Sequence, residues 1–179
     1  MENMGYIHVY TGNGKGKTTA AFGLAVRALC AGKNVYVGQF VKSMRYNETK
    51  IEQLFNGSVP SFGRIHIEQL GRGCFIGKVP EPADAETARQ GWERCAALLH
   101  SGEYDVVILD ELAIALYFGL LPASLVLKDL HSRCPSIEVI ITGRYAPGEL
   151  LDAADLVTEM AEVKHYYTQG VLSRDGIDK

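Results

Sequence analysis

The stretch from Tyr10 to Ala21, Tyr-Thr-Gly-Asn-Gly-Lys-Gly-Lys-Thr-Thr-Ala-Ala, constrains the fold of this chain more than any other part of the sequence. It follows an alternating, strand-like run (6–9) and precedes an apolar helical run (20–31). A glycine-rich loop between a strand and a helix is typical of phosphate binding. The glycines let backbone N–H groups converge on anionic oxygens, and the helix N-terminus adds its unpaired N–H groups. The sequence therefore predicts a phosphate-binding loop near the start of an α/β fold.

Two side chains at the end of this loop complete a Walker A arrangement. Lys17 supplies a positive charge for phosphates, and the Thr18 hydroxyl can reach a Mg²⁺ that bridges them. The pattern G-x-x-x-x-G-K-[ST] places its first glycine where this chain has Thr11, and a second lysine, Lys15, lies inside the loop. We therefore expect a non-standard geometry, with nucleotide contacts from one contiguous set of residues: Gly12, Asn13, Gly14, Lys15, Gly16, Lys17, Thr18 and Thr19.

Composition limits the classes of protein that this chain can belong to. Its 179 residues suit one domain spanning 1–179, and Lys plus Arg number 18 against 21 Asp plus Glu, so we expect no nucleic-acid partner. No apolar run approaches the roughly 20 residues needed to span a bilayer. The first five residues lack the charged and apolar regions of a signal peptide, so we expect a cytoplasmic protein with no membrane partner. The cysteines form no C-x-x-C pair, so we expect reduced and mostly buried thiols at Cys30, Cys74, Cys95 and Cys134.

Helical and strand-like patterns alternate along the chain. We expect strands near 6–10, 34–41, 65–70, 105–109, 138–142 and 156–160. We expect helices near 20–31, 47–55, 81–101, 121–134 and 147–154, a loop over 71–82, and a polar tail over 162–179 that wraps back over the domain. Such alternation predicts a mostly parallel sheet flanked by helices, in a single P-loop NTPase-like (RecA-like) α/β domain.

Ligands in such sheets bind beyond the carboxyl ends of the strands, and charged residues gather at that edge. Asp110 and Glu111 follow the apolar run 106–109, which is the Walker B arrangement, so we expect them beside a phosphate-bound Mg²⁺, directly or through a water. Arg144 follows another strand, and its planar fork suits a phosphate or a carboxylate. A plain surface arginine is the alternative for Arg144.

Three aromatic residues are candidates for contact with a large apolar ligand: Phe75 in the 71–82 loop, and Tyr117 and Phe118 after the acidic pair. Packing in the core is the alternative for each. No Ser/His/Asp or Cys/His constellation is apparent in the sequence. The chain thus looks equipped to hold a nucleoside triphosphate and poorly equipped with side-chain nucleophiles.

Several blocks of sequence resemble the P-loop family of ATP:corrinoid adenosyltransferases. The loop Thr-Gly-Asn-Gly-Lys-Gly-Lys-Thr (11–18) is much more specific than a generic Walker A motif, and it includes the departure at Thr11. The matching blocks occur in order along nearly the whole chain, at 10–23, 32–35, 39–42, 106–112, 139–144, 150–159, 163–167 and 176–178.

The resemblance implies a reaction that needs no protein nucleophile. In this family the cobalt of a reduced Co(I) corrinoid attacks the 5′ carbon of the ATP ribose, and triphosphate leaves as adenosylcobalamin or its precursor forms. The resemblance implies ATP, Mg²⁺ and a reduced corrinoid as ligands, with a homodimer and a flavoprotein that supplies Co(I). Carried over by position, 13–19 form the nucleotide loop, and Thr18 and Glu111 are the main Mg²⁺ contacts. We therefore expect Lys17 and Glu111 to be the catalytic residues, and Thr18, Asp110 and Glu111 to be the metal residues.

If the large apolar ligand is the corrinoid that the resemblance implies, Phe75, Tyr117 and Phe118 are its candidate contacts. Family members carry a Phe-x-Trp-like patch in the loop after the third strand, where this chain reads Gly-Arg-Gly-Cys-Phe-Ile-Gly (71–77) without a tryptophan. Two other functions stay open at this point. One is a P-loop kinase or ATPase of the thymidine-kinase kind, which usually carries a four-cysteine zinc site that the cysteine spacing here does not match. The other is a non-catalytic module that binds ATP or a corrinoid and delivers it.

Overall fold

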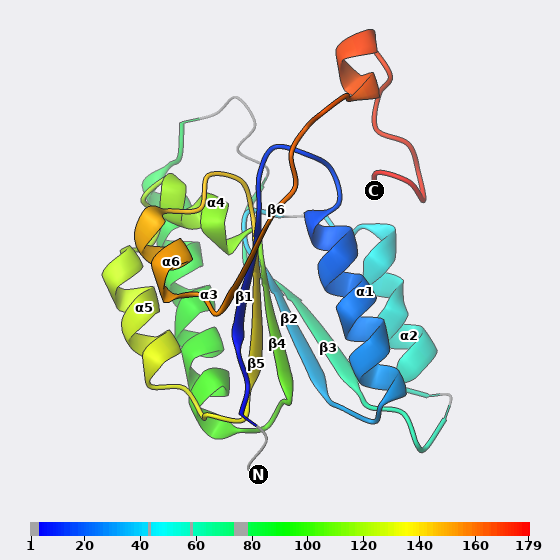
Figure 1. Ribbon diagram of the computed structural model, residues 1–179, viewed down its shortest axis with the longest axis vertical. Helices are drawn as coiled ribbons and strands as arrows, with labels where there is room; N and C mark the ends of the chain where they lie inside the picture. The colour runs from blue at the N-terminus through cyan, green and yellow to red at the C-terminus, as the bar shows by residue number, and fades with distance from the viewer. Residues whose placement is uncertain (1–3, 43, 58, 74–78) are drawn as a thin grey trace.

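The computed structural model describes residues 4–42, 44–57, 59–73 and 79–179, and they form an α/β fold around one parallel sheet (Figure 1). The sheet has six strands in the order β3-β2-β4-β5-β1-β6, and every neighbouring pair runs parallel. The strands are β1 (Ile7–Thr11), β2 (Val35–Gln39), β3 (Ile65–Gln69), β4 (Val106–Asp110), β5 (Glu138–Thr142) and β6 (Leu156–Glu159).

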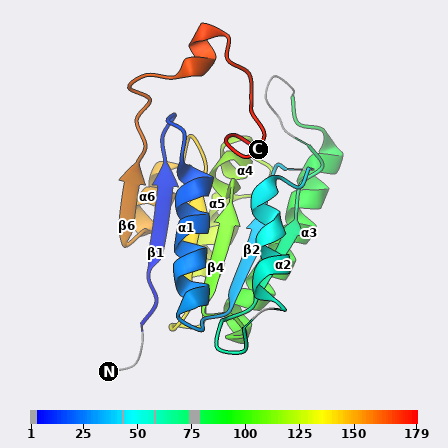
Figure 2. The ribbon, with the colours of Figure 1, turned by 90° about the vertical axis from the view of Figure 1, so that its right-hand side faces the viewer.

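Helices cover both faces of this sheet. Helices α1 and α2 lie on one face, and α3 to α6 lie on the other (Figures 1 and 2). The α-helices are α1 (Lys17–Cys30), α2 (Ile51–Phe55), α3 (Pro82–Ser101), α4 (Leu112–Tyr117), α5 (Ala123–His131) and α6 (Gly148–Ala153). Two short 3₁₀ helices are η1 (Asn47–Lys50) and η2 (Tyr166–Gln169). The expected α/β fold with a parallel sheet flanked by helices is confirmed.

Successive residues of the central strands pack on opposite faces of the sheet, because side chains alternate along a strand. In β4, Val106 and Ile108 pack with α1, whereas Val107 and Leu109 pack in the cluster that contains Trp92 of α3. All five β4 residues are buried. This burial explains why the strand reads as a continuous apolar run rather than as an alternating one.

Two details differ from the sequence expectations. Helix α4 was not predicted, because its six residues are too few to show a helical period. The expectation of mostly buried thiols is wrong for the described cysteines: Cys95 is buried, Cys134 is half-buried and Cys30 is exposed. Only one side of α1 packs on the sheet, and Cys30 is not among the residues of that buried side. Cys74 lies outside the described residues.

The chain after β6 wraps back over the domain, as expected. It extends beyond the carboxyl ends of the strands, and the C-terminus then returns toward the start of α1 (Figures 1 and 2). The Lys15 ammonium donates to the backbone oxygen of Ile177 at 2.7 Å, and Asn47 donates to that of Lys179 at 2.9 Å. Among the described residues, no helix combines the length and apolar character needed to cross a membrane.

We predict that α1 is held mainly by its buried face. Leu29 is 0% exposed and packs on the sheet, whereas Val26 on the same helix is 39% exposed. Leu29→Ala should lower the free energy of unfolding by about 2–5 kcal/mol, because it leaves a cavity in the core. Val26→Ala should change it by less than about 0.5 kcal/mol. Chemical denaturation measures both values, and equal losses would contradict this packing.

Candidate functional site

The loop after β1 turns at glycines, and the reason lies in the backbone. Thr11 still belongs to β1 and pairs with Glu159 of β6, so the turn begins only at Gly12, whose φ is 95°. A Cβ at Gly12 would lie 2.5 Å from the backbone oxygen of Met160, and one at Gly14 would lie 2.6 Å from the same atom. The Gly14 N–H donates to that oxygen at 2.7 Å. Position 11 is therefore still part of the strand, and the conformation that requires glycine begins one residue later.

Lys17 opens α1 and places its ammonium inside the loop. Its Nζ donates to the backbone oxygens of Gly12 and Gly14, at 2.7 Å in each case, and the residue is only 6% exposed. Burial lowers the pKa of Lys17, while the negative charge of Glu111 acts in the opposite direction. The charge of Lys17 is therefore directed toward the centre of the loop, where phosphate oxygens bind in Walker A sites.

Asp110, at the carboxyl end of β4, is the centre of a buried hydrogen-bond network. Its Oδ1 accepts from the hydroxyls of Thr18 (2.8 Å) and Thr142 (2.7 Å). Its Oδ2 accepts from the Gln39 amide (2.9 Å) and the Lys42 ammonium (2.7 Å). Burial by itself raises the pKa of the Asp110 carboxyl, but the charge of Lys42 and the hydrogen bonds from Lys42, Thr142 and Gln39 outweigh it and hold this pKa below its ordinary value.

Glu111 follows in a left-handed backbone conformation, with a φ of 61°. Its N–H donates to the Thr142 hydroxyl at 3.0 Å, and α4 begins at the next residue. Burial, and after it the negative charge of Asp110, raises the pKa of Glu111. The pKa values of these adjacent carboxyl groups are thus shifted in opposite directions. Four side-chain donors bond the Asp110 carboxylate, whereas none of the described residues donates to that of Glu111.

The other residues predicted to bind the nucleotide lie around this centre. Arg144 is exposed just after β5, and its charge acts on both Glu111 and Lys17. Lys15 forms an ion pair with Asp178 of the tail at 3.0 Å. The remaining loop residues are exposed at Asn13 and Thr19, and half-buried at Gly12, Gly16 and Thr18.

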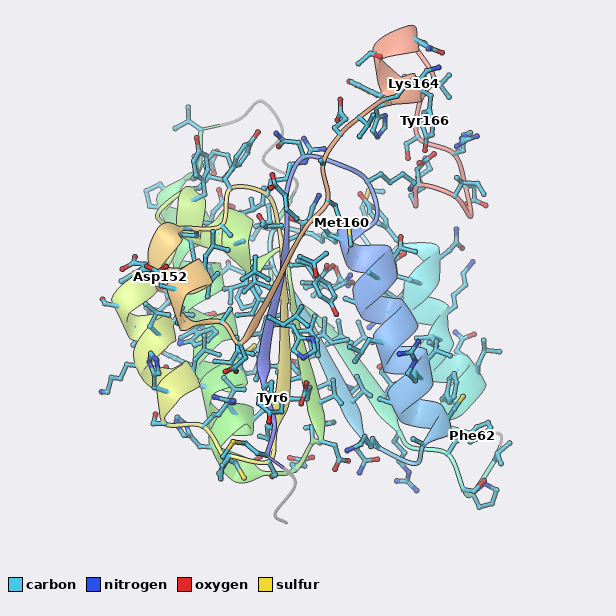
Figure 3. All side chains as sticks on the ribbon, viewed as in Figure 1. Tyr6, Phe62, Asp152, Met160, Lys164 and Tyr166 are labelled. Carbon is cyan, nitrogen blue, oxygen red and sulfur yellow. The ribbon has the colours of Figure 1, made fainter. Side chains whose placement is uncertain are left out.

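A cavity of about 380 Å³ lies between the loop and the tail. Gly14 and Lys15 line one side of this cavity, and residues 161–166 line the other. Figure 3 shows Lys164 and Tyr166 on the tail segment, beyond Met160 and above the carboxyl ends of the strands. The volume lies within the range of small-molecule sites.

Aromatic rings gather at the same edge of the sheet. Tyr117, at the end of α4, packs against Tyr145 with ring centroids 4.6 Å apart, and against Phe118 with centroids 5.4 Å apart. Tyr117 is 57% exposed and Tyr145 is 49% exposed. The structure therefore brings Tyr117 and Phe118 to the edge where a ligand was expected, and it adds Tyr145. Phe75 lies outside the described residues.

Sequence reasoning missed four residues of this region: Gln39, Lys42, Thr142 and Tyr145. A signal for them existed, because each lies at or just after the carboxyl end of β2 or β5, where ligands of parallel sheets bind. The block Gln39–Lys42 had been noted only as a matching motif. Its contacts with Asp110 depend on the pairing of β2 with β4, in which Gln39 is the register partner of Asp110.

Comparison with known proteins agrees with this geometry. Residues 3–178 match the family model described as ATP:corrinoid adenosyltransferase BtuR/CobO/CobP. Corrinoid adenosyltransferases of Pseudomonas aeruginosa and of Escherichia coli K12 are each 36% identical over 177 residues, which cover 99% of this chain and 85% and 87% of those proteins. The corrinoid adenosyltransferase CobA of Salmonella typhimurium is 37% identical over 177 residues, or 87% of its length. This chain therefore belongs to the ATP:corrinoid adenosyltransferase family.

Proposed function

We propose that this protein transfers the 5′-deoxyadenosyl group of ATP to the cobalt of a reduced corrinoid and releases triphosphate. The observation that carries the proposal is the position of the Lys17 ammonium, enclosed by its loop and adjacent to the Thr18–Asp110 pair. Such a loop binds a polyphosphate strongly, and family membership identifies the polyphosphate as the leaving group.

In this reaction the bond-forming electron pair comes from the Co(I) of the substrate. It forms a Co–C bond to the 5′ carbon, while the bond from that carbon to the α-phosphate oxygen breaks and its electrons stay on triphosphate. The loop N–H groups between Gly12 and Thr18, together with Lys17, stabilise this negative charge. The protein otherwise has to hold the two substrates in line.

The residues around Thr18 fit a nucleotide-bound Mg²⁺. A hydroxyl and carboxylates are the oxygen ligands that this ion takes, and Thr18 and Glu111, with Asp110 behind them, would hold it. No group of three or more His, Cys, Asp or Glu side chains suited to a metal occurs in the part of the chain that the structure describes. This agrees with an ion bound mainly by phosphates and water. When bound, Mg²⁺ would neutralise part of the triphosphate charge.

The proposal extends to the second substrate and to the assembly. The rings of Phe118 and Tyr145 both pack against the Tyr117 ring, and we assign these three residues to the corrinoid, together with Phe75 by resemblance. A flavoprotein that reduces the corrinoid to Co(I), a homodimer and a cytoplasmic location are parts of the same proposal. The family resemblance supports these three parts.

The phosphate product tests this function. The full-length protein, incubated with Mg-ATP and chemically reduced cobalamin, should release triphosphate and form a light-sensitive Co–C bond. Ion chromatography of the phosphates and the visible spectrum of the cobalamin measure the two products. Orthophosphate or ADP would indicate a P-loop kinase or ATPase instead, and binding without turnover would indicate a delivery module.

Lys17→Ala should lower the rate of adenosylation by about 10²-fold or more, because a preorganised charge next to the leaving group is lost. Lys33→Ala is the matched control, since Lys33 is exposed beyond the far end of α1 and should leave the rate unchanged. Steady-state kinetics with saturating ATP measure both rates. A Lys17→Ala enzyme with near-wild-type turnover would mean that triphosphate binds elsewhere.

Tyr145→Ala should raise the KM for the corrinoid by about three- to tenfold, because an aromatic contact contributes roughly 0.5–1.5 kcal/mol. The KM for ATP should stay unchanged, and Tyr145→Phe should behave like the wild type because it keeps the ring. Tyr6→Ala is the matched control, since Tyr6 is 50% exposed at the opposite end of the sheet (Figure 3). Equal effects on both KM values would contradict the assignment of this ring to the corrinoid.

A further inference from the structure

The block Gln39–Lys42 begins at the last residue of β2, and its Gln39 and Lys42 side chains donate to the same oxygen of Asp110. The adenosyl transfer described above gives this block no role. Asp110 is 0% exposed, and each of its two oxygens accepts two hydrogen bonds. A carboxylate offers about four acceptor positions, so hydrogen bonds already occupy all of those on Asp110. A metal ion could bind Asp110 directly only by displacing one of these donors.

Among the four donors to Asp110, Lys42 is the one that carries a positive charge. The Lys42 side chain is 13% exposed, and its ammonium lies 3.7 Å from Glu48 and 5.3 Å from the centre of the Tyr46 ring. The ammonium would lie next to any cation bound at Oδ2, where like charges repel. Lys42 therefore occupies the side of Asp110 where a divalent ion would otherwise bind.

The backbone around Lys42 is built to deliver this ammonium. Val41 is buried in a left-handed conformation with a φ of 62°. Gly71 packs against it so closely that a Cβ at position 71 would lie 2.5 Å from the Val41 nitrogen. This conformation is strained for a residue other than glycine, so the turn persists only because its surroundings impose it. Lys42 is thus placed by a defined turn and is not a mobile surface lysine.

On the opposite oxygen, Asp110 fixes the direction of the Thr18 hydroxyl. A hydroxyl has a single proton, and Thr18 donates it to Oδ1 of Asp110. The lone pairs of the Thr18 oxygen are then left as acceptors, which is what a metal ligand requires. Among the described residues, none donates a hydrogen bond to the Glu111 carboxylate, so this acid also keeps its acceptor capacity.

We propose that Lys42 is a positioning residue for the nucleotide metal. Its ammonium occupies one acceptor position of Asp110, so that Asp110 stays hydrogen-bonded and orients Thr18, while Thr18 and Glu111 provide the protein ligands. The inference rests on the proposed function, because it requires Mg-ATP at the loop. Gln39 supports the same oxygen of Asp110 through its amide.

Binding of ATP in the presence and absence of Mg²⁺ tests this role without turnover. ATP is titrated into the full-length protein without corrinoid, in Mg²⁺ or in EDTA, and calorimetry measures the affinity. Lys42→Met should weaken binding in Mg²⁺ about tenfold or more, the typical effect of losing a residue that orients a metal ligand, and should leave binding in EDTA near the wild-type value. Lys42→Arg, which keeps the charge, should recover part of the loss. Lys33→Met, before the other end of β2, is the matched control and should change neither affinity.

A double variant separates this role from folding. Lys42→Met leaves a buried charge without its partner and can unfold the protein, whereas Lys42→Met with Asp110→Asn removes both charges. Thermal unfolding without nucleotide should show the double variant more stable than Lys42→Met, and it should still lack the Mg²⁺-specific part of the affinity. Equal losses in Mg²⁺ and EDTA, no loss at all, or full recovery in the double variant would overturn the proposal. If Lys42→Met shows the Mg²⁺-specific loss of ATP affinity but the wild-type protein releases no triphosphate, the proposed reaction is overturned and this inference is supported.

Discussion

The buried carboxylate of Asp110 is the interaction on which the rest of the site depends. A charge with no solvent exposure costs several kcal/mol unless partners surround it. Its four partners come from three other elements: Thr18 from α1, Gln39 and Lys42 from β2 and the turn after it, and Thr142 from β5. These elements can supply their donors together only when β2, β4 and β5 are neighbours with their carboxyl ends aligned. The strand order that defines the sheet therefore also assembles the site.

The phosphate loop depends on a second long-range contact, with the chain after β6. Gly12 and Gly14 are necessary because the backbone of Met160 passes within contact distance of both. The tail then returns to Lys15 through Ile177 and Asp178. The loop thus differs from the general Walker A pattern because a neighbouring segment occupies the space that side chains would need. The chain after β6 (160–179), in which η2 is a single short helix, consequently shapes the start of α1.

Sequence reasoning worked where the signal is local. The continuous apolar run of β4 predicted a strand buried on both faces, and the loop and the acidic pair were recognised from short motifs. It failed where the information lies in pairing between distant segments. Lys42 meets Asp110 across 68 residues of sequence, and Lys15 meets Ile177 across 162. Tyr145 joins Tyr117 only because α4, too short to be predicted, follows β4 at the edge where β5 also ends.

A single side chain at the end of β5, that of Thr142, contacts both Asp110 and Glu111. The Thr142 hydroxyl donates its proton to Asp110 and accepts a hydrogen bond from the N–H of Glu111. It therefore links an acid whose acceptor positions are all occupied to one whose acceptor positions are not. Glu111 has a left-handed backbone, which costs about 1–3 kcal/mol in a residue other than glycine, and the contact with Thr142 helps to hold it there. That conformation ends the strand and begins α4. A reaction whose nucleophile is a substrate needs such fixed positions more than it needs reactive side chains.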